Sequence, residues 1–225
     1  GQHFAKAYDI TYLDKDGKLK YVWQTSWGVT TRLIGAIIMV HGDDRGLKLP
    51  PKIAPIQAVI VPIMGKESET VLNKAQEIYS ILKNEILIEL DDRNEYTPGW
   101  KFNEWEMKGV PVRIEIGPRD IKNQQVVLVR RDTGEKTVVS ESELLPRLKS
   151  LLADIQINMF NQAKEFLNEN IREVKNFDEF KQIINEKRGF IKAHWCKNGE
   201  CEQKIKEETG ATLRCIPFSN ETTYG

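Results

Sequence analysis

The chain has 225 residues, 40% of them hydrophobic and 29% charged, and its 33 basic side chains balance 33 acidic ones. This length allows two domains and a small third one, and the composition is typical of an ordinary globular protein. Zero net charge excludes an indiscriminate nucleic-acid binder, which would be strongly basic. The most apolar run, Leu33–Val40, is too short to span a bilayer, which needs about 20 residues.

The N-terminal sequence GQHFAKAYD has neither a signal-peptide pattern nor an initiator Met, and it reads as the middle of a larger protein. Alternating residues at 8–12 and an extended pattern at 21–27 predict a hairpin around the turn Asp16-Gly17. Gly28 ends the second strand. The apolar positions from Leu33 to Val40 then predict a mostly buried helix. A buried strand is the alternative, and the length of the segment favours a helix.

Pro50, Pro51 and Pro55 predict a stiff, extended linker and mark the clearest domain boundary. The pattern after this linker is strand, helix, strand, connection, strand, strand, helix, which is typical of a small α/β domain. The predicted strands are 58–61, 86–90, 112–116 and 126–129, and the predicted helices are 68–82 and 142–157. Residues 158–225 begin with a helical pattern and end in short apolar segments around the cysteines.

All three cysteines lie within the last 30 residues. This clustering argues against a secreted disulfide framework and favours a metal site in a reducing compartment, with buried free thiols as the alternative. Cys196 and Cys201 form one pair with four residues between them. A closed structural zinc site needs four ligands, and His194 and Cys215 do not complete a clear set.

The segment Thr25-Ser26-Trp27-Gly28-Val29-Thr30-Thr31-Arg32 predicts a strand, a glycine break and the start of a helix. Such a helix N-terminus favours anionic groups, and Arg32 adds a permanent cation with a planar face, suited to a phosphate or a purine. On general grounds, a strand–turn–helix with a surface arginine is the more ordinary explanation.

The longer segment WQTSWGVTTRLIGAIIMVHGDDRGLKLPPKIAPIQ resembles motif 3 of class II aminoacyl-tRNA synthetases and is closely similar to the archaeal/eukaryotic-type prolyl-tRNA synthetases. GWKFNEWEMKGVPVRIEIGPRD and the segments RGFIKAHWC and GECEQKIKEETGATLRCIPF extend the resemblance over the chain. It implies a chain of α/β and α+β fold class in three parts. These are the end of a class II antiparallel-sheet catalytic domain (1–54), an α/β anticodon-binding domain (55–157) and a small, truncated α/β zinc-type domain (158–225).

The resemblance also implies an activity: ATP-dependent activation of proline and its transfer to the proline tRNA, with ATP and magnesium as cofactors. Arg32 would be the catalytic residue, contacting the ATP phosphates and adenine, and Thr30 would lie in the ATP site. Ser26, Trp27 and Gly28 match the strand that floors the proline pocket. Motifs 1 and 2 of the family lie before the point where this sequence starts, so we expect the chain alone to be inactive.

The middle domain of this family reads the anticodon. Proline anticodons share two guanines, whose Watson–Crick edge offers N–H groups to an acceptor, and unpaired bases also stack on aromatic rings. Residues 98–120 supply aromatic, basic and acidic side chains; any single aromatic here is as well explained as a core residue. We expect anticodon contacts from Lys101, Phe102, Glu104, Arg113 and Arg119, with Trp100, Trp105, Glu106 and Lys108 as further candidates.

Related synthetases carry a C-terminal zinc domain whose first cysteine pair has the same spacing as Cys196 and Cys201. The resemblance therefore implies half a zinc site here, with Cys215 as a buried thiol. It further implies a cytoplasmic enzyme that forms a homodimer at full length, binds the proline tRNA, and has no membrane or DNA partner. The alternatives are a non-catalytic tRNA-binding module and a synthetase-like regulatory paralogue.

Overall fold

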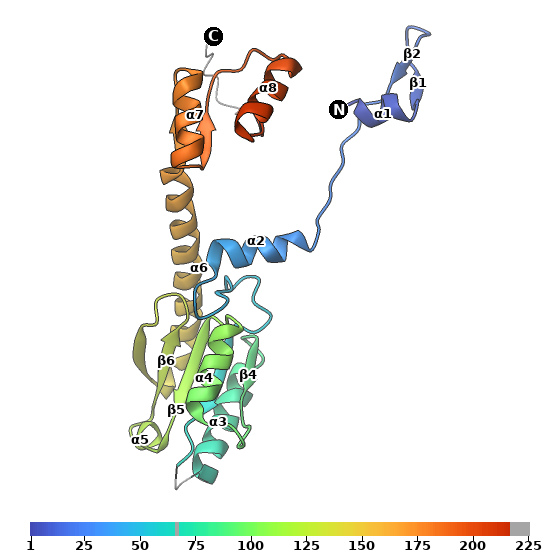
Figure 1. The fold of residues 1–225 in the computed structure, drawn as a ribbon. Helices are drawn as coiled ribbons and strands as arrows, with labels where there is room; N and C mark the ends of the chain where they lie inside the picture. Colours follow the sequence, from blue (N-terminus) through green and yellow to red (C-terminus); the bar gives the residue numbers. More distant parts are fainter. Residues whose placement is uncertain (66–67, 217–225) are drawn as a thin grey trace. The chain divides into compact units, whose positions relative to one another are not determined.

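The computed structural model describes residues 1–65 and 68–216, which fall into two compact units, residues 1–40 and the residues from 41 onward. Figure 1 gives the element labels used below. No helix in the part of the chain that the structure describes is long and apolar enough to cross a membrane.

The first unit begins with the short helix α1 (His3–Ala7) and the antiparallel hairpin of β1 (Thr11–Leu13) and β2 (Leu19–Tyr21). Gly17 has a φ of +73° in the turn, a conformation that glycine adopts without steric cost. The predicted hairpin is therefore confirmed. Its second strand is shorter than expected because residues 22–31 pair with no other strand among the described residues, and an unpaired strand leaves its backbone groups unsatisfied.

The helix predicted after Gly28 is present as α2 (Arg32–His41). The expectation that it is mostly buried is wrong, since Leu33 and Ile34 are both more than half exposed. Of the residues described in this unit, only Ala5 is buried, so the unit has no core onto which the apolar side of α2 can pack. The apolar pattern correctly indicated a helix but did not indicate its environment.

The second unit starts with a segment that lies on the surface of a sheet domain. The predicted extended linker is wrong, because residues 50–54 form a turn in which Pro50 O accepts hydrogen bonds from Ile53 N and Ala54 N. Lys52 N also donates to the side chain of Gln156, at 3.1 Å. The prolines therefore fix a packed turn.

The sheet domain contains a five-stranded mixed sheet with the order β4-β3-β5-β6-β7. Its two parallel pairs join β3 to β4 and β5, and its two antiparallel pairs join β5 to β6 and β6 to β7. The strands are β3 (Ala58–Pro62), β4 (Ile88–Leu90), β5 (Val112–Ile116), β6 (Gln125–Arg130) and β7 (Lys136–Ser140). All four predicted strands are present; β7 was not predicted.

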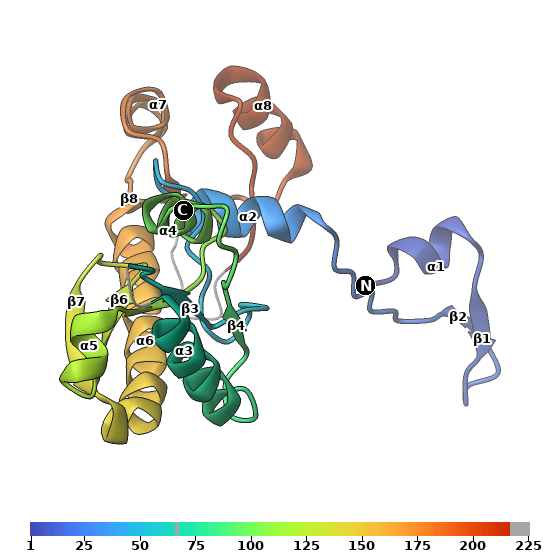
Figure 2. The ribbon, with the colours of Figure 1, turned by 90° about the horizontal axis from the view of Figure 1, so that it is seen from below.

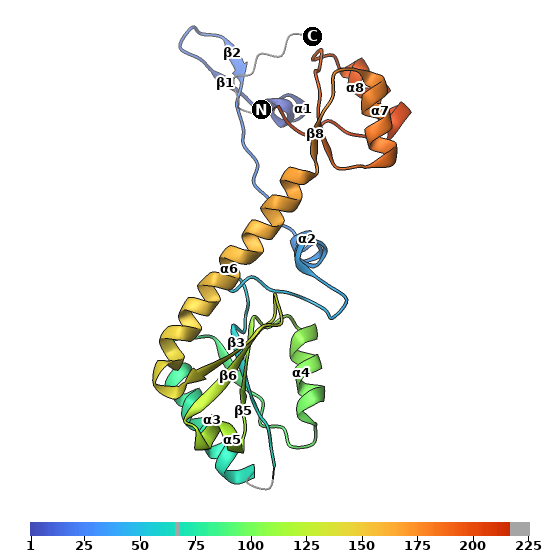
Figure 3. The same cartoon turned by 90° about the vertical axis from the view of Figure 1, so that its left-hand side faces the viewer.

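The helices cover the two faces of this sheet unequally. One face carries α3, α5 and α6, and the other carries only α4, as Figures 2 and 3 show. The helices are α3 (Ser68–Leu82), α4 (Pro98–Met107), α5 (Pro118–Lys122) and α6 (Leu144–Glu169), the last preceded by the 3₁₀ turn Glu141–Glu143. The main core lies under α3 and α6, where alternate strand residues such as Ile60, Ile114 and Leu128 are fully or almost fully buried.

Helix α6 has 26 residues and extends to Glu169, beyond the predicted end near residue 157. Residues 171–209 then form a β-α-β-α segment, in which β8 and β9 are parallel. Parallel strands need a crossover, which the helix α7 between them provides. The elements are β8 (Ile171–Glu173), α7 (Phe177–Glu186), β9 (Phe190–Lys192) and α8 (Gly199–Thr209).

Candidate functional site

The face of the sheet that carries α4 is only partly covered. Phe102 and Trp105 of α4 pack over Val59 and Val61 of β3. Farther along the sheet the same face opens toward the edge strand β7, where Val138 is 59% exposed, while Arg113 and Glu115 of β5 stay buried. Outward-facing residues on this part alternate with core residues along each strand. The open face carries Arg113 and Glu115 of β5, Val127 of β6, and Lys136 and Val138 of β7.

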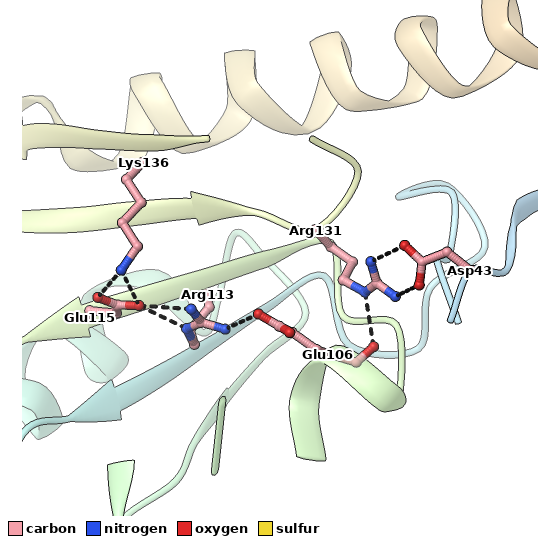
Figure 4. Close-up of polar contacts among 6 residues, drawn as sticks. All are labelled: Asp43, Glu106, Arg113, Glu115, Arg131 and Lys136. Carbon is pink, nitrogen blue, oxygen red and sulfur yellow. Dashed lines mark hydrogen bonds and ion pairs between the residues drawn. The ribbon is translucent and has the colours of Figure 1, made fainter. Parts of the chain in front are cut away.

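A network of charged side chains occupies this open face (Figure 4). Arg113 donates from Nη1 to Glu106 Oε1 at 3.0 Å, and from Nε and Nη2 to Glu115 Oε1 at 3.0 and 2.8 Å. Lys136 Nζ lies 3.3 Å from Glu115 Oε2. The guanidinium of Arg113 also lies over the ring of Phe102, 4.0 Å from its centroid. Arg113 and Glu115 are buried, so their opposite charges compensate each other inside the protein.

Two members of the network remain accessible. The side chain of Glu106 is 25% exposed and that of Lys136 is 57% exposed. Glu106 uses only Oε1 toward Arg113, and its Oε2 accepts no hydrogen bond from the residues that the structure describes. The face therefore offers a carboxylate acceptor held by Arg113, an exposed cation, and apolar contacts from Val127 and Val138. Such a set can accept N–H groups of an unpaired base and contact its phosphate.

Arg131 lies beside the C-terminal end of α4, next to Glu106. Its Nε donates to the backbone oxygen of Glu106 at 2.9 Å, and its two Nη atoms donate to the carboxylate of Asp43 at 3.0 and 2.6 Å. Lys48 adds a second cation 3.0 Å from Asp43. The hydrogen bonds from Arg131 hold the pKa of Asp43 well below its ordinary value, although burial opposes this shift.

A second cluster lies on the opposite flank of α4, next to β4. The buried Asp91 accepts hydrogen bonds from Arg93 at 2.9 and 2.7 Å and from Trp105 Nε1 at 2.8 Å. Burial raises the pKa of Asp91, but these hydrogen bonds and the charge of Lys101 outweigh it and lower the pKa to about 2. Lys101 is 1% exposed and donates to Asp91 O at 2.9 Å.

Glu104 belongs to this second cluster. It pairs with Arg93 and with Lys108, and these two cations lower its pKa. Arg93 also lies beside the stacked rings of Tyr96 and Trp100, whose centroids are 3.9 Å apart.

The structure thus separates the residues expected to contact an anticodon. Phe102 and Arg113 lie together on the open face, with Glu106 between them and the surface. Glu104 lies on the other flank of α4. The expectation for Lys101 is corrected, because its ammonium group points into the interior and satisfies a backbone oxygen. Arg119 is exposed on α5, directly after β5.

Three residues were not predicted: Glu115 and Lys136 of the open-face network, and the adjacent Arg131. A signal for the first existed in the segment VRIEI, where Arg113 and Glu115 alternate with apolar residues. That alternation indicates a strand with a polar face. Arg131 and Lys136 carried no comparable signal, because they lie beside the turn between β6 and β7, where charged residues are common.

The residues expected to bind ATP and proline lie in the first unit. Thr30 Oγ1 accepts a hydrogen bond from Arg32 N at 3.3 Å, at the start of α2. Ser26, Trp27 and Gly28 lie in the irregular segment before this helix, where Trp27 is 93% exposed.

Two families match separate parts of the chain. Residues 57–151 match the anticodon binding domain, and residues 177–224 match the C-terminal domain of prolyl-tRNA synthetase. The open face with its charged network lies entirely within the first match.

Over these two parts the chain is similar to an anticodon binding domain followed by the C-terminal part of a prolyl-tRNA synthetase.

Similar proteins agree with this assignment. The chain is 60% identical over 223 residues to a proline–tRNA ligase of Natranaerobius thermophilus and 57% identical over 221 residues to one of Alkaliphilus oremlandii. It is also 53% identical over 222 residues to proline–tRNA ligase 2 of Clostridioides difficile. These matches cover 98–99% of this chain but 46% of each relative, so the chain spans about half their length. All three relatives are bacterial, and they do not support the narrower expectation of an archaeal or eukaryotic type.

The cysteines lie in the prolyl-tRNA synthetase C-terminal domain. The neighbouring thiol of Cys201 lowers the pKa of Cys196, and Cys196 in turn raises the pKa of Cys201, so the two side chains lie close together. They could supply two ligands to a zinc ion. Within residues 1–65 and 68–216, no group of three or more His, Cys, Asp or Glu residues is placed to hold a metal. The expectation for Cys215 is wrong: its thiol is exposed.

Proposed function

We propose that this chain is part of a proline–tRNA ligase, and that its anticodon-binding domain reads the proline anticodon at the open face of the sheet. The observation that carries the proposal is the network of Glu106, Arg113, Glu115 and Lys136 on an uncovered face of a domain in the anticodon-binding family. The chain as a whole is neutral, so binding rests on this local arrangement rather than on bulk attraction.

In this proposal Glu106 is the acceptor for guanine. Guanine presents N1–H and the exocyclic amino group on its Watson–Crick edge, and a carboxylate accepts both, whereas adenine offers a different pattern. Arg113 holds Glu106 through one oxygen and leaves the other for the base. Lys136 and Arg119 are exposed cations for the phosphates of the loop. Phe102 supports the guanidinium of Arg113 from below.

The remaining activity belongs to the longer protein: ATP-dependent formation of an activated proline and transfer of the prolyl group to tRNA, with magnesium, in a homodimer. This chain would contribute Arg32 and Thr30 to the ATP site and Ser26, Trp27 and Gly28 to the proline pocket. Phosphoryl chemistry of this kind depends on fixed cations around the phosphates. Arg32, at the N-terminus of α2, is suited to that role because the helix dipole there also favours anions.

Binding of tRNA to the 225-residue chain tests the anticodon proposal. We expect tighter binding of a proline tRNA than of the same tRNA with both anticodon guanines replaced by adenines, measured by filter binding or fluorescence anisotropy at one salt concentration. Equal dissociation constants for the two tRNAs would remove the proposal.

Variants of the two α4 glutamates distinguish the two candidate acceptors. Glu106→Gln should reduce the discrimination between these tRNAs by roughly tenfold, since the amide is a neutral, weaker acceptor and carries an NH2 donor in place of one carboxylate oxygen. If Glu104 is the acceptor instead, as the sequence led us to expect, Glu104→Gln will show the loss. Glu85→Gln is the matched control, because Glu85 pairs with Lys149 among the helices on the far face of the sheet.

Arg32→Ala in the longer protein tests the ATP-site assignment. It should abolish proline-dependent ATP–pyrophosphate exchange, because a fixed cation at the phosphates is lost, and leave the dissociation constant for tRNA nearly unchanged. Retained exchange would contradict the role of Arg32.

A further inference from the structure

The chain segment that precedes the sheet domain is attached to the end of α4. This segment, residues 43–49, is called the strap below. Leu47 N donates to Met107 O at 3.0 Å, and Leu49 N donates to Gly109 O at 3.1 Å. The two backbones lie so close that a Cβ on Gly109 would be 2.6 Å from Leu47 Cβ. The last residues of α4 and the strap therefore form one continuous hydrogen-bonded structure.

Arg131 fastens this junction from the side of the sheet. It is buried, and its guanidinium donates in two directions, to the carboxylate of Asp43 in the strap and to the backbone oxygen of Glu106 in α4. The planar fork of arginine makes such a double contact possible, whereas the single ammonium group of lysine cannot reproduce it.

Helix α4 depends on these contacts. It has 10 residues, fewer than the roughly 12–15 at which an isolated helix becomes even marginally stable. The last carbonyl groups of a helix have no partners within it. Here Glu106 O accepts from Arg131 in addition to Gly109 N, which follows the helix, and Met107 O accepts from the strap. The position of the final turn, which carries Glu106, is thus set from outside the helix.

The contacts continue from this turn to the open face (Figure 4). The side chain of Glu106 meets Arg113, Arg113 meets Glu115, and Glu115 meets Lys136. A shift of the last turn of α4 would therefore move the carboxylate that we assign to guanine. It would also disturb the ion pair between Glu106 and the buried Arg113.

We propose that Arg131 and Asp43 are positioning residues for anticodon recognition: they fix Glu106 at the open face and tie its position to the strap. This inference rests on the proposed function of the open face. Neither residue contacts RNA. Their effect reaches the RNA through the backbone of Glu106, so selectivity for guanine should depend on them more than overall affinity does.

The test uses the 225-residue chain and the two tRNAs described above, with the proline anticodon or with both guanines replaced. Arg131→Lys should lower the ratio of the two dissociation constants by roughly tenfold, since a charge-assisted hydrogen bond at Glu106 loses its alignment. Phosphate contacts remain, so binding of the substituted tRNA should change less than twofold.

Arg130→Lys is the matched control. Arg130 precedes Arg131, makes an equivalent two-pronged pair with Asp132 at 2.9 and 2.7 Å, and points to the other face of the sheet. It should cost similar thermal stability and leave the ratio of dissociation constants unchanged. If both variants lower the ratio equally, the effect is general destabilisation and the inference is overturned.

A double variant gives the sharpest outcome. In a Glu106→Gln chain, Arg131→Lys should reduce the ratio no further, because Arg131 acts through Glu106. An additive loss would overturn the inference.

If Arg131→Lys does not fold, as judged by circular dichroism, Asp43→Asn removes only the strap side of the contact and must show the same non-additivity. A wild-type chain that does not discriminate between the tRNAs removes the proposed function itself, whereas discrimination that survives Arg131→Lys and Asp43→Asn removes only this inference.

Discussion

Individual carboxylates of the anticodon-binding domain are held by arginines, and the strength of each pair depends on burial. Asp43 and Asp91 both lie against a guanidinium, and each has a lowered pKa. Removing one partner of a buried pair leaves an uncompensated charge, which costs far more than the loss of a surface pair. Asp91 is buried whereas Asp43 is exposed, so the pair at Asp91 should contribute more to the response of the domain to acid.

The pair at Asp91 predicts how the stability of the fold depends on pH. The pKa of Asp91 is about 2 in the folded chain, against an ordinary value of 3.8. A depressed pKa stabilises the fold above about pH 4, and this contribution is lost as the pH falls from about 4 to 2. It amounts to roughly 2 kcal/mol. Asp91→Asn should remove this part of the acid sensitivity, measured by urea unfolding at pH 6 and pH 3. An unchanged difference in unfolding free energy between pH 6 and pH 3 would contradict this prediction.

For individual residues, the sequence showed which of them carry charge but not which of them are buried. The alternation in β5 correctly placed Arg113 on a polar strand face, since strand periodicity is local. Lys101 and Glu104 looked equivalent to Glu106 in a short amphipathic segment. Their positions depend on Asp91 and Arg93, which follow a different strand, and such long-range pairing leaves no mark in the local pattern.

Among the elements, those with strong local patterns were predicted and those built on tertiary contacts were not. Helix α3 and strand β5 have clear apolar periodicity, and both were found. Helix α4 has mostly polar and aromatic residues and is held by the strap and Arg131, so its sequence indicated only a connection. Strand β7 is a partly exposed edge strand with one buried residue, which weakens its signal.

The close approach between the strap and α4 makes a prediction at Gly109. Gly109 and Gly134 have φ values of +77° and +76°, but only at Gly109 would an added Cβ meet backbone and side-chain atoms within 3 Å. Gly134→Ala should cost roughly 1–2 kcal/mol from the backbone conformation alone. Gly109→Ala should cost roughly 1–3 kcal/mol more from the collision with Leu47. Chemical denaturation of both variants measures the difference in unfolding free energy. Equal losses would mean that the strap and α4 can move apart at Gly109 without cost.

For the molecule as a whole, the sequence predicted a hairpin, a helix and then an α/β domain along the chain, but not the surroundings of α2. Its apolar residues indicated burial, yet the described residues of the first unit provide no core for it. Burial is a property of neighbouring elements, and a periodic pattern specifies only which side of a helix is apolar.

The C-terminal domain makes a prediction about metal. Cys196 and Cys201 provide two adjacent thiols, and two ligands leave half of the tetrahedral shell of zinc to water. The 225-residue chain should therefore bind zinc weakly, losing it to a chelator such as EDTA within a single dialysis. A firmly held equivalent, measured by mass spectrometry under native conditions, would contradict this. Cys215→Ser and His194→Ala would then identify the additional ligands.

The contact between Asp43 and Arg131 also bears on how the chain folds. The two residues are 88 positions apart, and closing a loop of that length costs roughly 4 kcal/mol of chain entropy. Arg131 reaches its place only after β6 has joined β5, so the strap can dock only on an assembled sheet. Contacts that form after the transition state slow unfolding without accelerating folding. We therefore expect the strap to dock late in folding and to detach early in unfolding, and the carboxylate of Glu106 to become ordered together with it.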